Sequence, residues 1–252
     1  MSDKAWRAVR EVPPLDAGEV HVWLDDLRAS PPWAAGELLS PEERDQALRF
    51  SAAPRRDTFV RGRAFLRFLA GRHLATPASA VPLRIMPSGK PVIDVPAGAA
   101  PLWVNLAHSG NVLAVAVTRS GEVGVDVEAE DRAVDRDAIA RRFFSDAEAR
   151  ALAALPEAAE PAAFIAAWVC KEAVLKAVGD GLAIPLREVE LAITPSSPDS
   201  APRLLRVPAD YGSIAEWSLL ALAPRPGMAG AVAVRAPGVR LRCFRWSDAR
   251  RL

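Results

Sequence analysis

The chain has 252 residues, of which half are hydrophobic and a quarter are charged, and its formal net charge is +1. This composition is that of a globular protein, and the near-zero charge argues against broad nucleic-acid binding, which needs a basic face. The N-terminus has no apolar run typical of a secretion signal, and the longest apolar run, residues 162–170, is too short to span a bilayer. Two cysteines form neither a disulfide framework nor a zinc site, so we expect a cytoplasmic protein that binds neither nucleic acid nor membrane.

The chain contains an internal repeat, in which four segments of the first half each resemble one of the second. The pairs are residues 20–24 and 123–127, 38–44 and 143–149, 61–67 and 170–176, and 113–119 and 230–235. The first and last pairs alternate like strands, and the second pair holds Ser40 and Ser145, each followed three residues later by Glu as in a helix capping box. The offset between paired residues grows from 103 to 117, as loop insertions in the second half would produce. Chance similarity between Ala-rich amphipathic segments is the alternative.

The repeat predicts an α+β fold built as a pseudo-dimer of two similar halves. We expect one half at residues 1–119 and the other at residues 120–252, with a ligand cleft at their interface. Because such a chain already contains its own two-fold interface, we expect a monomer.

Gly124, Asp126 and Glu128 share one face of the strand predicted around residues 123–127, because successive strand side chains point to opposite faces. The two carboxylates are roughly 7 Å apart at their bases and are able to converge on one hard cation such as Mg²⁺. Gly124 removes bulk beside them, as the close approach of a ligand would require. The alternative is an exposed strand face that simply carries charge.

Residues 168–182 hold two of the four lysines of a chain that otherwise uses 28 arginines as its cations. Lys provides a compact, mobile charge that suits the handling of phosphate, whereas Arg is a rigid fork. In a helix, Trp168, Glu172 and Lys176 share a face because each is four residues from the next. Glu172 is therefore placed to complete a metal site, and Lys176 to reach the phosphate that the metal binds.

Lys171 lies about 100° around the same helix, at the edge of this face. Gly179 and Gly181 follow as left-handed caps that end the helix. The alternatives are a solvated helix face with a Glu–Lys pair, and an ordinary core position for Trp168.

In the first half, Lys90 stands in the turn 88–91, and His108 and Ser109 stand where a strand breaks into a loop. Five arginines within thirteen residues suit either a solvated face or an anionic ligand; they are Arg55, Arg56, Arg61, Arg63 and Arg67. The remaining histidines, His21 and His73, have no polar company that suggests a site.

Several familiar catalytic motifs are absent from the sequence. It has no glycine-rich phosphate loop, no dinucleotide fingerprint after a strand and no Gly-x-Ser-x-Gly elbow. The candidate catalytic groups that remain are the carboxylates, with the cation that they are able to bind, and the lysines.

Taken in order, these motifs resemble those of the 4′-phosphopantetheinyl transferase superfamily, in its long, Sfp-like branch. The matching segments are Gly89–Pro91, Asn105–Ser109, Gly124–Glu128, Arg142–Ser145 and Trp168–Lys176 with residues 179–182. Each motif alone is weak, but five in the same order and spacing are specific, and the repeat extends the likeness over nearly the whole chain.

The resemblance implies an enzyme that moves the 4′-phosphopantetheine arm of coenzyme A onto a serine hydroxyl of an acyl- or peptidyl-carrier protein, releasing adenosine 3′,5′-bisphosphate. The Sfp-like length implies carriers of peptide or polyketide synthesis. Phosphoryl transfer needs charge neutralisation and alignment more than covalent help. The resemblance accordingly implies Mg²⁺ at the coenzyme pyrophosphate, held by Asp126, Glu128 and Glu172.

The resemblance also implies residue roles. Glu172, or a water it orders, would take the serine proton, Lys176 would offset charge on the phosphates, and Lys171 would supply charge or a proton near the leaving group. The residues implied to bind the coenzyme are Arg55, Arg63, Lys90, Pro91, His108, Ser109, Asp126 and Lys176.

The sequence departs from the family pattern at three positions. Ala107 stands where the family often has Ser, and Glu43 and Gln46 stand where Sfp-type members have lysines. Recognition of the coenzyme phosphates must then rely on other cations, such as Arg44 or the arginines between positions 55 and 63.

Two other functions are weighed against transfer. One is a non-catalytic module of the same fold that binds coenzyme A or a carrier protein, although a decayed site should have lost at least one of its carboxylates or Lys176. The other is a different Mg²⁺-dependent enzyme that acts on a nucleotide pyrophosphate without any carrier protein.

Overall fold

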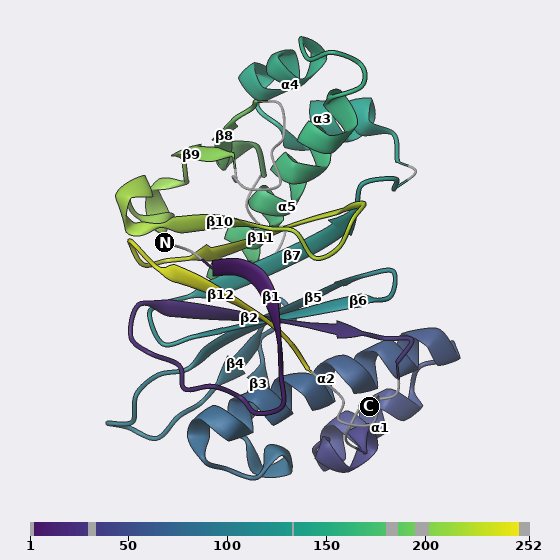
Figure 1. The fold of residues 1–252 in the computed structure, drawn as a ribbon, viewed down its shortest axis with the longest axis vertical. Coiled ribbons are helices and arrows are strands. Elements are labelled where there is room, and N and C mark those ends of the chain that lie inside the picture. The colour runs from purple at the N-terminus through teal and green to yellow at the C-terminus, as the bar shows by residue number, and fades with distance from the viewer. Residues whose placement is uncertain (1–2, 30–33, 133, 180–185, 195–201, 247–252) are drawn as a thin grey trace.

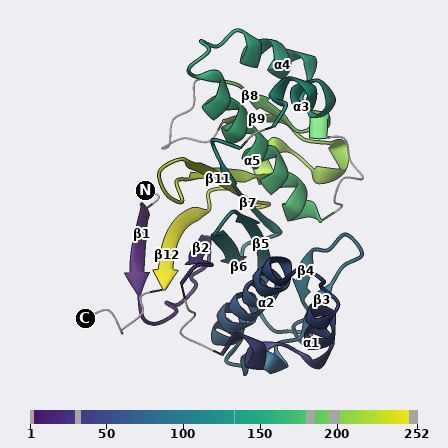
Figure 2. The same cartoon turned by 90° about the vertical axis from the view of Figure 1, so that its right-hand side faces the viewer.

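A computed structural model describes residues 3–29, 34–132, 134–179, 186–194 and 202–246. Gly181, predicted to cap a helix, lies outside these described residues. The helices gather in two lobes, with the five-stranded and the three-stranded sheet between them (Figures 1 and 2). One lobe holds α1 (Pro41–Leu48) and α2 (Ala53–Leu74), and the other holds α3 (Arg136–Phe143), α4 (Asp146–Ala153) and α5 (Glu160–Val178).

The chain enters through strand β1 (Asp3–Val9) and then runs through the first half. The elements of this half are β2 (Glu19–Asp26), α1 (Pro41–Leu48), α2 (Ala53–Leu74), β3 (Leu83–Ile85), β4 (Pro91–Ile93), β5 (Trp103–Ser109) and β6 (Val112–Thr118).

Among the described residues, the second half repeats the order from β2 to β6 with one more helix and, at its end, one more strand, β12. Its elements are β7 (Val123–Ala129), α3 (Arg136–Phe143), α4 (Asp146–Ala153), α5 (Glu160–Val178), β8 (Glu190–Ala192), β9 (Arg203–Arg206), β10 (Ser218–Leu222), β11 (Met228–Val234) and β12 (Arg240–Trp246).

The sheet topology confirms the predicted α+β pseudo-dimer. In the first half β2, β6 and β5 pair in that order, antiparallel throughout, and in the second half β7, β11 and β10 do the same. Each half also carries a small hairpin after its long helix, β3–β4 in one and β8–β9 in the other. The repeat seen in the sequence is therefore a repeat of topology.

The last strand leaves its own half. β12 pairs in parallel with β2 on one side and with β1 on the other, so the five-stranded sheet has the order β1-β12-β2-β6-β5. Residues 240–246 thus complete the sheet of the first half. The division of the chain at residues 119 and 120 stays a prediction.

Three apolar layers hold the fold together. α2 covers the outer face of the five-stranded sheet, where Phe65 and Leu69 pack with Trp23 and Phe244. α5 covers the outer face of the three-stranded sheet. Between the sheets lies a layer of small and β-branched residues, which include Val22, Ala114, Val125 and Val232. The two halves meet across this middle layer.

The predicted helix starts are confirmed at Ser40 and Ser145. Each serine side chain accepts a hydrogen bond from the backbone N–H of Glu43 or Glu148, and each glutamate accepts one in return from the serine N–H. Both glutamates are buried, so both boxes lie against the core. Within the described ranges, no helix has the length and apolarity needed to cross a membrane.

Candidate functional site between the two halves

Strand β7 and helix α5 are in unusually close contact, and Gly124 is the reason. A Cβ added at Gly124 would lie 2.0 Å from the Ala173 carbonyl oxygen and 2.3 Å from the Ala177 nitrogen. The sequence suggested that this glycine makes room for a ligand; that prediction is wrong, because the space is taken by the backbone of α5. Its effect is to bring the carboxylates of β7 up to the polar face of the helix.

Asp126 faces that helix and is paired with Lys176. The Lys176 Nζ donates to Asp126 Oδ1 at 2.6 Å, while Asp126 Oδ2 is buried without a hydrogen-bond partner among the described residues. Burial raises the pKa of Asp126 to about 6, with Lys176 opposing the rise and Glu172 and Glu128 adding to it. Asp126 is thus a buried acid with one satisfied and one unsatisfied oxygen.

The other two predicted carboxylates stand near Asp126. Glu172 is half-buried on the same helix face as Lys176, and burial raises its pKa while Lys176 opposes the rise. Glu128 accepts a hydrogen bond from the Ser109 hydroxyl at 2.7 Å and another from Arg132. The structure therefore brings the acidic residues of β7 and α5 to one place. Lys176 already lies beside Asp126, and Arg132 lies beside Glu128.

The donor set fits a hard divalent cation, although the side chains are not arranged around one. Within the described residues, no three His, Cys, Asp or Glu side chains form a ready cluster for a metal ion. Lys176 and Arg132 instead hold oxygens of Asp126 and Glu128. The buried, unpartnered Oδ2 of Asp126 is nevertheless the kind of ligand that Mg²⁺ takes in proteins.

A cavity of about 330 Å³ opens beside these carboxylates and is lined by both halves of the chain. Glu172 and Lys176 line it from α5, and Arg63, Lys90 and Asn105 line it from the first half, together with Pro91. Lys90 reaches across, donating to the Ala177 carbonyl, with its stem packed against Gly179. A ligand at the predicted interface would meet three cations here.

A second cavity, of about 540 Å³, adjoins the first and shares Arg63 with it. Phe50, Phe59, Arg55 and His108 contribute to its more apolar lining. The Arg63 Nη1 is buried without a hydrogen-bond partner among the described residues, and burial lowers the pKa of its guanidinium. The two cavities together have the size and the mixed character suited to a nucleotide with phosphate groups.

Three of the five clustered arginines line neither cavity; they are Arg56, Arg61 and Arg67, and the last two are held in ion pairs. Arg61 makes a bidentate ion pair with Asp25, at 2.5 and 2.8 Å, and Arg67 pairs with Glu43 at 2.5 Å. Arg61 and Arg67 are both buried. They therefore neither belong to a solvated face nor are free to bind an anionic ligand, which were the two predictions for the cluster. Arg55 and Arg56 are exposed, and Arg63 is the member that lies between the cavities.

Lys171 is not brought to the carboxylates, in contrast to its predicted role near the leaving group. Its ammonium is fully buried, 2.8 Å from Glu148 Oε2, and it donates to the backbone carbonyls of Leu186 and Val189. The ring of Phe144 lies 4.9 Å away. Lys171 therefore faces the core of the second half rather than the cavity, and a direct part in catalysis stays a prediction that this placement does not support.

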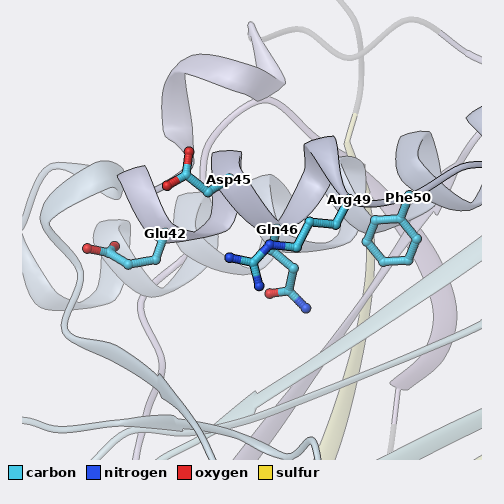
Figure 3. Close-up of a pocket in the computed structure, with 5 residues that line it drawn as sticks. All are labelled: Glu42, Asp45, Gln46, Arg49 and Phe50. Carbon is cyan, nitrogen blue, oxygen red and sulfur yellow. The ribbon is translucent and has the colours of Figure 1, made fainter.

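A further hollow lies along α1, outside the cavities just described (Figure 3). Its lining consists of Glu42, Asp45, Gln46, Arg49 and Phe50, and Phe50 also borders the cavity of His108. None of the predicted catalytic, coenzyme-binding or metal residues lines it. Arg44, suggested as a substitute cation, is bonded to the Leu39 carbonyl.

Three polar contacts of the structure were not predicted from the sequence. The sequence pattern indicated no role for Asn105, whose Oδ1 accepts the Val125 N–H, or for Arg132. It also indicated no polar company for His21, but His21 is buried and its Nε2 lies 3.0 Å from Glu19. An amide between the apolar Val104 and Leu106 of a strand was the available signal for Asn105.

Trp168 occupies the position that the core alternative predicted. Its ring lies 5.7 Å from that of Phe143 and 6.5 Å from that of Phe164. Trp168 thereby joins the apolar cluster of the second half. The helix face predicted for Trp168, Glu172 and Lys176 thus changes from core at one end to cavity at the other.

Carboxylates with raised pKa values, several cations and a cleft between two halves define a class of site suited to phosphate-bearing ligands. Comparison with known proteins is more specific. Residues 122–217 match the family described as the 4′-phosphopantetheinyl transferase superfamily. The chain is also 35% identical to 4′-phosphopantetheinyl transferase HetI of Nostoc sp. over 234 residues, which cover 89% of this chain and 91% of HetI.

Two further comparisons cover less of the chain. The 4′-phosphopantetheinyl transferase Sfp of Bacillus subtilis is 30% identical over 150 residues, which cover 59% of this chain and 64% of Sfp. The solved structure of Thermotoga maritima holo-[acyl-carrier-protein] synthase aligns with a TM-score of 0.35 and 22% identity over 47% of this chain, a likeness too small to support an argument.

The extent of the match to HetI shows that this chain belongs to the 4′-phosphopantetheinyl transferase superfamily. It is a transferase that moves phosphopantetheine from coenzyme A to a carrier protein, and the family that the sequence motifs resembled is confirmed. The comparisons favour this catalytic function over a binding module that has lost turnover.

Proposed function

We propose that transfer takes place at the seam between the halves, with Asp126 and Glu172 as the principal ligands of a Mg²⁺ ion and Glu128 beside them. One observation carries the proposal: Asp126 Oδ2 and Arg63 Nη1, one from each half, are both buried without partners among the described residues, next to or lining the cavity of Glu172 and Lys176. A buried charged atom without a partner is unfavourable, so a bound ligand is the natural source of its missing interactions. When bound, Mg²⁺ would neutralise the coenzyme pyrophosphate and align it for attack.

The cations of this chain would divide the remaining work. Lys176 now neutralises Asp126, and it would contact the coenzyme phosphate beside the metal. Lys90 and Arg63 border the same cavity and would hold phosphate oxygens, with Pro91 supporting the turn. Arg55 and His108 would contact the nucleotide in the adjoining cavity. Ser109 acts through Glu128, whose orientation its hydroxyl holds.

Glu172 is our candidate for the general base. Burial raises the pKa of Glu172. A carboxylate with a raised pKa is a stronger base, and it therefore accepts a proton from a hydroxyl more readily near neutral pH. The serine of the carrier protein would enter at the open side of this cavity and lose its proton to Glu172 or to a water that Glu172 orders. The new bond joins the serine oxygen to the phosphorus of the phosphopantetheine, and adenosine 3′,5′-bisphosphate leaves.

Three wider features belong to the same proposal. We expect a monomer, because the middle apolar layer already buries the two-fold interface within one chain. We also expect cytoplasmic action without nucleic-acid or membrane partners, supported by the composition and the near-zero net charge. Carriers of peptide and polyketide synthesis remain the expected substrates by resemblance to the long branch of the family.

Intact-protein mass spectrometry tests the proposal directly. An apo-carrier protein is incubated with coenzyme A and Mg²⁺, with and without a chelator, and should gain the mass of one phosphopantetheine only without the chelator. Asp126→Ala and Glu172→Ala should each slow the gain by about 100-fold or more, while circular dichroism stays unchanged. Glu130→Ala, at an exposed position of the same segment, is the matched control and should transfer normally. Wild-type rates in either site variant would remove that residue from the proposal.

A further inference from the structure

Asn105 is a polar residue in the apolar layer between the two sheets. It lies in the middle of β5, opposite Ala116 of β6, and is only 4% exposed. Ala107, on the same face of β5, belongs to the core between the halves. A buried amide in such surroundings is unfavourable unless its hydrogen bonds are made, so its partner indicates its purpose.

That partner is the backbone of β7. Within the described residues β7 pairs with β11 on one edge, and its other edge faces β5 without a strand-to-strand ladder. The Val125 N–H points to this free edge and donates to Asn105 Oδ1 at 3.0 Å, in a buried position. The side chain of Asn105 thus takes the place of a neighbouring strand for one backbone donor.

The bond meets β7 between two residues that already define the site. Gly124, on one side of Val125, is in backbone contact with α5, and Asp126, on the other, carries the buried carboxylate paired with Lys176. The strand is therefore held from the helix side at Gly124 and from the first half at Val125. The position of Asp126 relative to α5 depends on both contacts.

The orientation of the amide follows from chemistry. A backbone N–H only donates, so the oxygen of Asn105 must face Val125 and the NH₂ group must be at the other end. Asn105 also lines the cavity of Arg63, Lys90 and Lys176. Replacing the amide by a carboxylate would keep the acceptor for Val125 and remove the donor.

We propose that Asn105 is a positioning residue, which holds β7 through the Val125 amide so that Asp126 stays in register with Glu172 and Lys176. This inference rests on the proposed function, because it acts through Asp126. Without the acceptor, a buried N–H loses its partner and β7 gains freedom to shift at the point where the carboxylate stands. Residues that orient metal-binding side chains in this way typically change metal affinity or activity by about 10–100-fold when removed.

The test compares Asn105→Leu, which has a similar shape and no acceptor, with Asn105→Asp, which keeps the acceptor. Thr118→Val is the matched control, because it removes other side-chain bonds to backbone in the first half. The Thr118 hydroxyl donates to the Glu19 carbonyl and accepts from the Ser120 N–H. Three quantities are measured: amide hydrogen exchange at Val125 in the protein alone, the Mg²⁺ concentration that half-saturates transfer, and the unfolding temperature.

Asn105→Leu should exchange the Val125 amide faster and need about tenfold more Mg²⁺ or more. Thr118→Val should lower only the unfolding temperature. Asn105→Asp should need no more Mg²⁺ than the wild type, since its added charge favours a cation. If Asn105→Leu does not fold, Asn105→Ala takes its place with the same expectations.

An Asn105→Leu protein with wild-type Mg²⁺ requirement, or an Asn105→Asp protein as impaired as Asn105→Leu, overturns the proposal. Failure of the wild-type chain to transfer would count against the proposed function instead. In that case the amide exchange of Val125 still tests whether Asn105 holds β7. Unchanged exchange in Asn105→Leu would refute that role.

Discussion

Buried charged residues in this chain fall into two groups, according to whether the described residues satisfy them. Arg61, Arg67 and Lys171 each have a carboxylate partner together with backbone carbonyls. Asp126 and Arg63 each keep one buried atom without a partner in the part of the chain that the structure describes. The first group stabilises the fold, and the second lies at the seam where a charged ligand is proposed to bind.

Lys171 and Lys176 provide the sharpest contrast at this scale. Lys171→Met removes one member of a fully buried ion pair and should lower the free energy of unfolding by about 3–5 kcal/mol, because Glu148 is left as a buried unpaired charge. Lys176→Met, at a half-buried position, should change stability much less and slow transfer strongly. Urea unfolding and the transfer rate of the folded protein measure the two effects.

A Lys171→Met protein with normal stability and no transfer would contradict this division and restore a direct catalytic role for Lys171. The double variant Lys171→Met with Glu148→Leu serves as the control for the buried charge. It should recover part of the stability that Lys171→Met loses, since both charges are then absent.

At the scale of elements, the contact between β7 and α5 decides where the acidic groups meet. The strand supplies Asp126 and the helix supplies Glu172 and Lys176, and only a glycine at position 124 lets the two backbones approach so closely. The helix then ends at Gly179, in the left-handed conformation, where the stem of Lys90 packs. Two glycines thus set the distances between elements that carry the proposed chemistry.

Gly124→Ala should be strongly destabilising or prevent folding, because its methyl group would lie 2.0 Å from the Ala173 carbonyl oxygen and would force α5 away from β7. Gly36→Ala is the matched control: nothing lies within 4 Å of a Cβ there, and it should be neutral. Thermal unfolding of the two variants measures the difference. Equal unfolding temperatures would show that the helix and strand are not in this contact.

At the scale of the whole molecule, the chain is a pseudo-dimer whose halves are not separable in sequence. β12 lies between β1 and β2, and its Leu241, Cys243 and Phe244 are buried in the layers on both sides of the sheet. The first half therefore obtains a central strand from the end of the chain.

The fragment of residues 1–119, which lacks β12, should not fold by itself. Its sheet would have β1 and β2 separated by a missing strand, with apolar side chains left exposed. Circular dichroism should show little regular structure and no cooperative melting, whereas the whole chain should melt cooperatively under the same conditions. A cooperative transition in the fragment would show that residues 1–119 are an independent domain.

Buried histidines should make the stability of the whole fold depend on pH. The rings of His21 and His73 lie 6.1 Å apart. Burial, together with the nearby His21 and Arg119, lowers the pKa of His73 to about 4. Burial also lowers the pKa of His21, against the effect of Glu19. In the unfolded chain each histidine would bind a proton near pH 6.5, whereas in the folded chain it binds one only at lower pH. Because the unfolded state then holds more protons, the free energy of unfolding should fall as the pH drops from 6.5 toward 4.

Substitution of His73 by Phe should reduce this loss by about 1–3 kcal/mol between pH 6.5 and pH 4, measured by urea unfolding at several pH values. Asp126 has the opposite effect. Because its pKa is raised in the folded chain, its contribution to the free energy of unfolding is lost as the pH rises from 3.8 through about 6. It is present in both proteins, and its effect cancels in the comparison. An unchanged pH slope in His73→Phe, with the exposed His108→Phe as control, would contradict the interpretation.

Features that depend only on neighbouring residues follow directly from the sequence. Strand alternation, helix periodicity and the two capping boxes are local, so the internal repeat, the α+β fold and the shared faces of Asp126 with Glu128 and of Glu172 with Lys176 were predictable from spacing. The order and spacing of the motifs likewise indicated the family. The roles of the individual site residues remain predictions that the proposed experiments test.

Partners that lie far apart in the chain are fixed by the packing of the whole fold. Lys171 and Lys176 look alike in sequence, but the packing of α5 turns one toward Glu148 and the other toward Asp126. Asn105 meets Val125 and β12 enters the first sheet for the same reason. Such pairings minimise the number of unsatisfied polar groups and the exposed apolar surface of the whole fold. A local sequence pattern cannot predict them, because they depend on all the elements packing together.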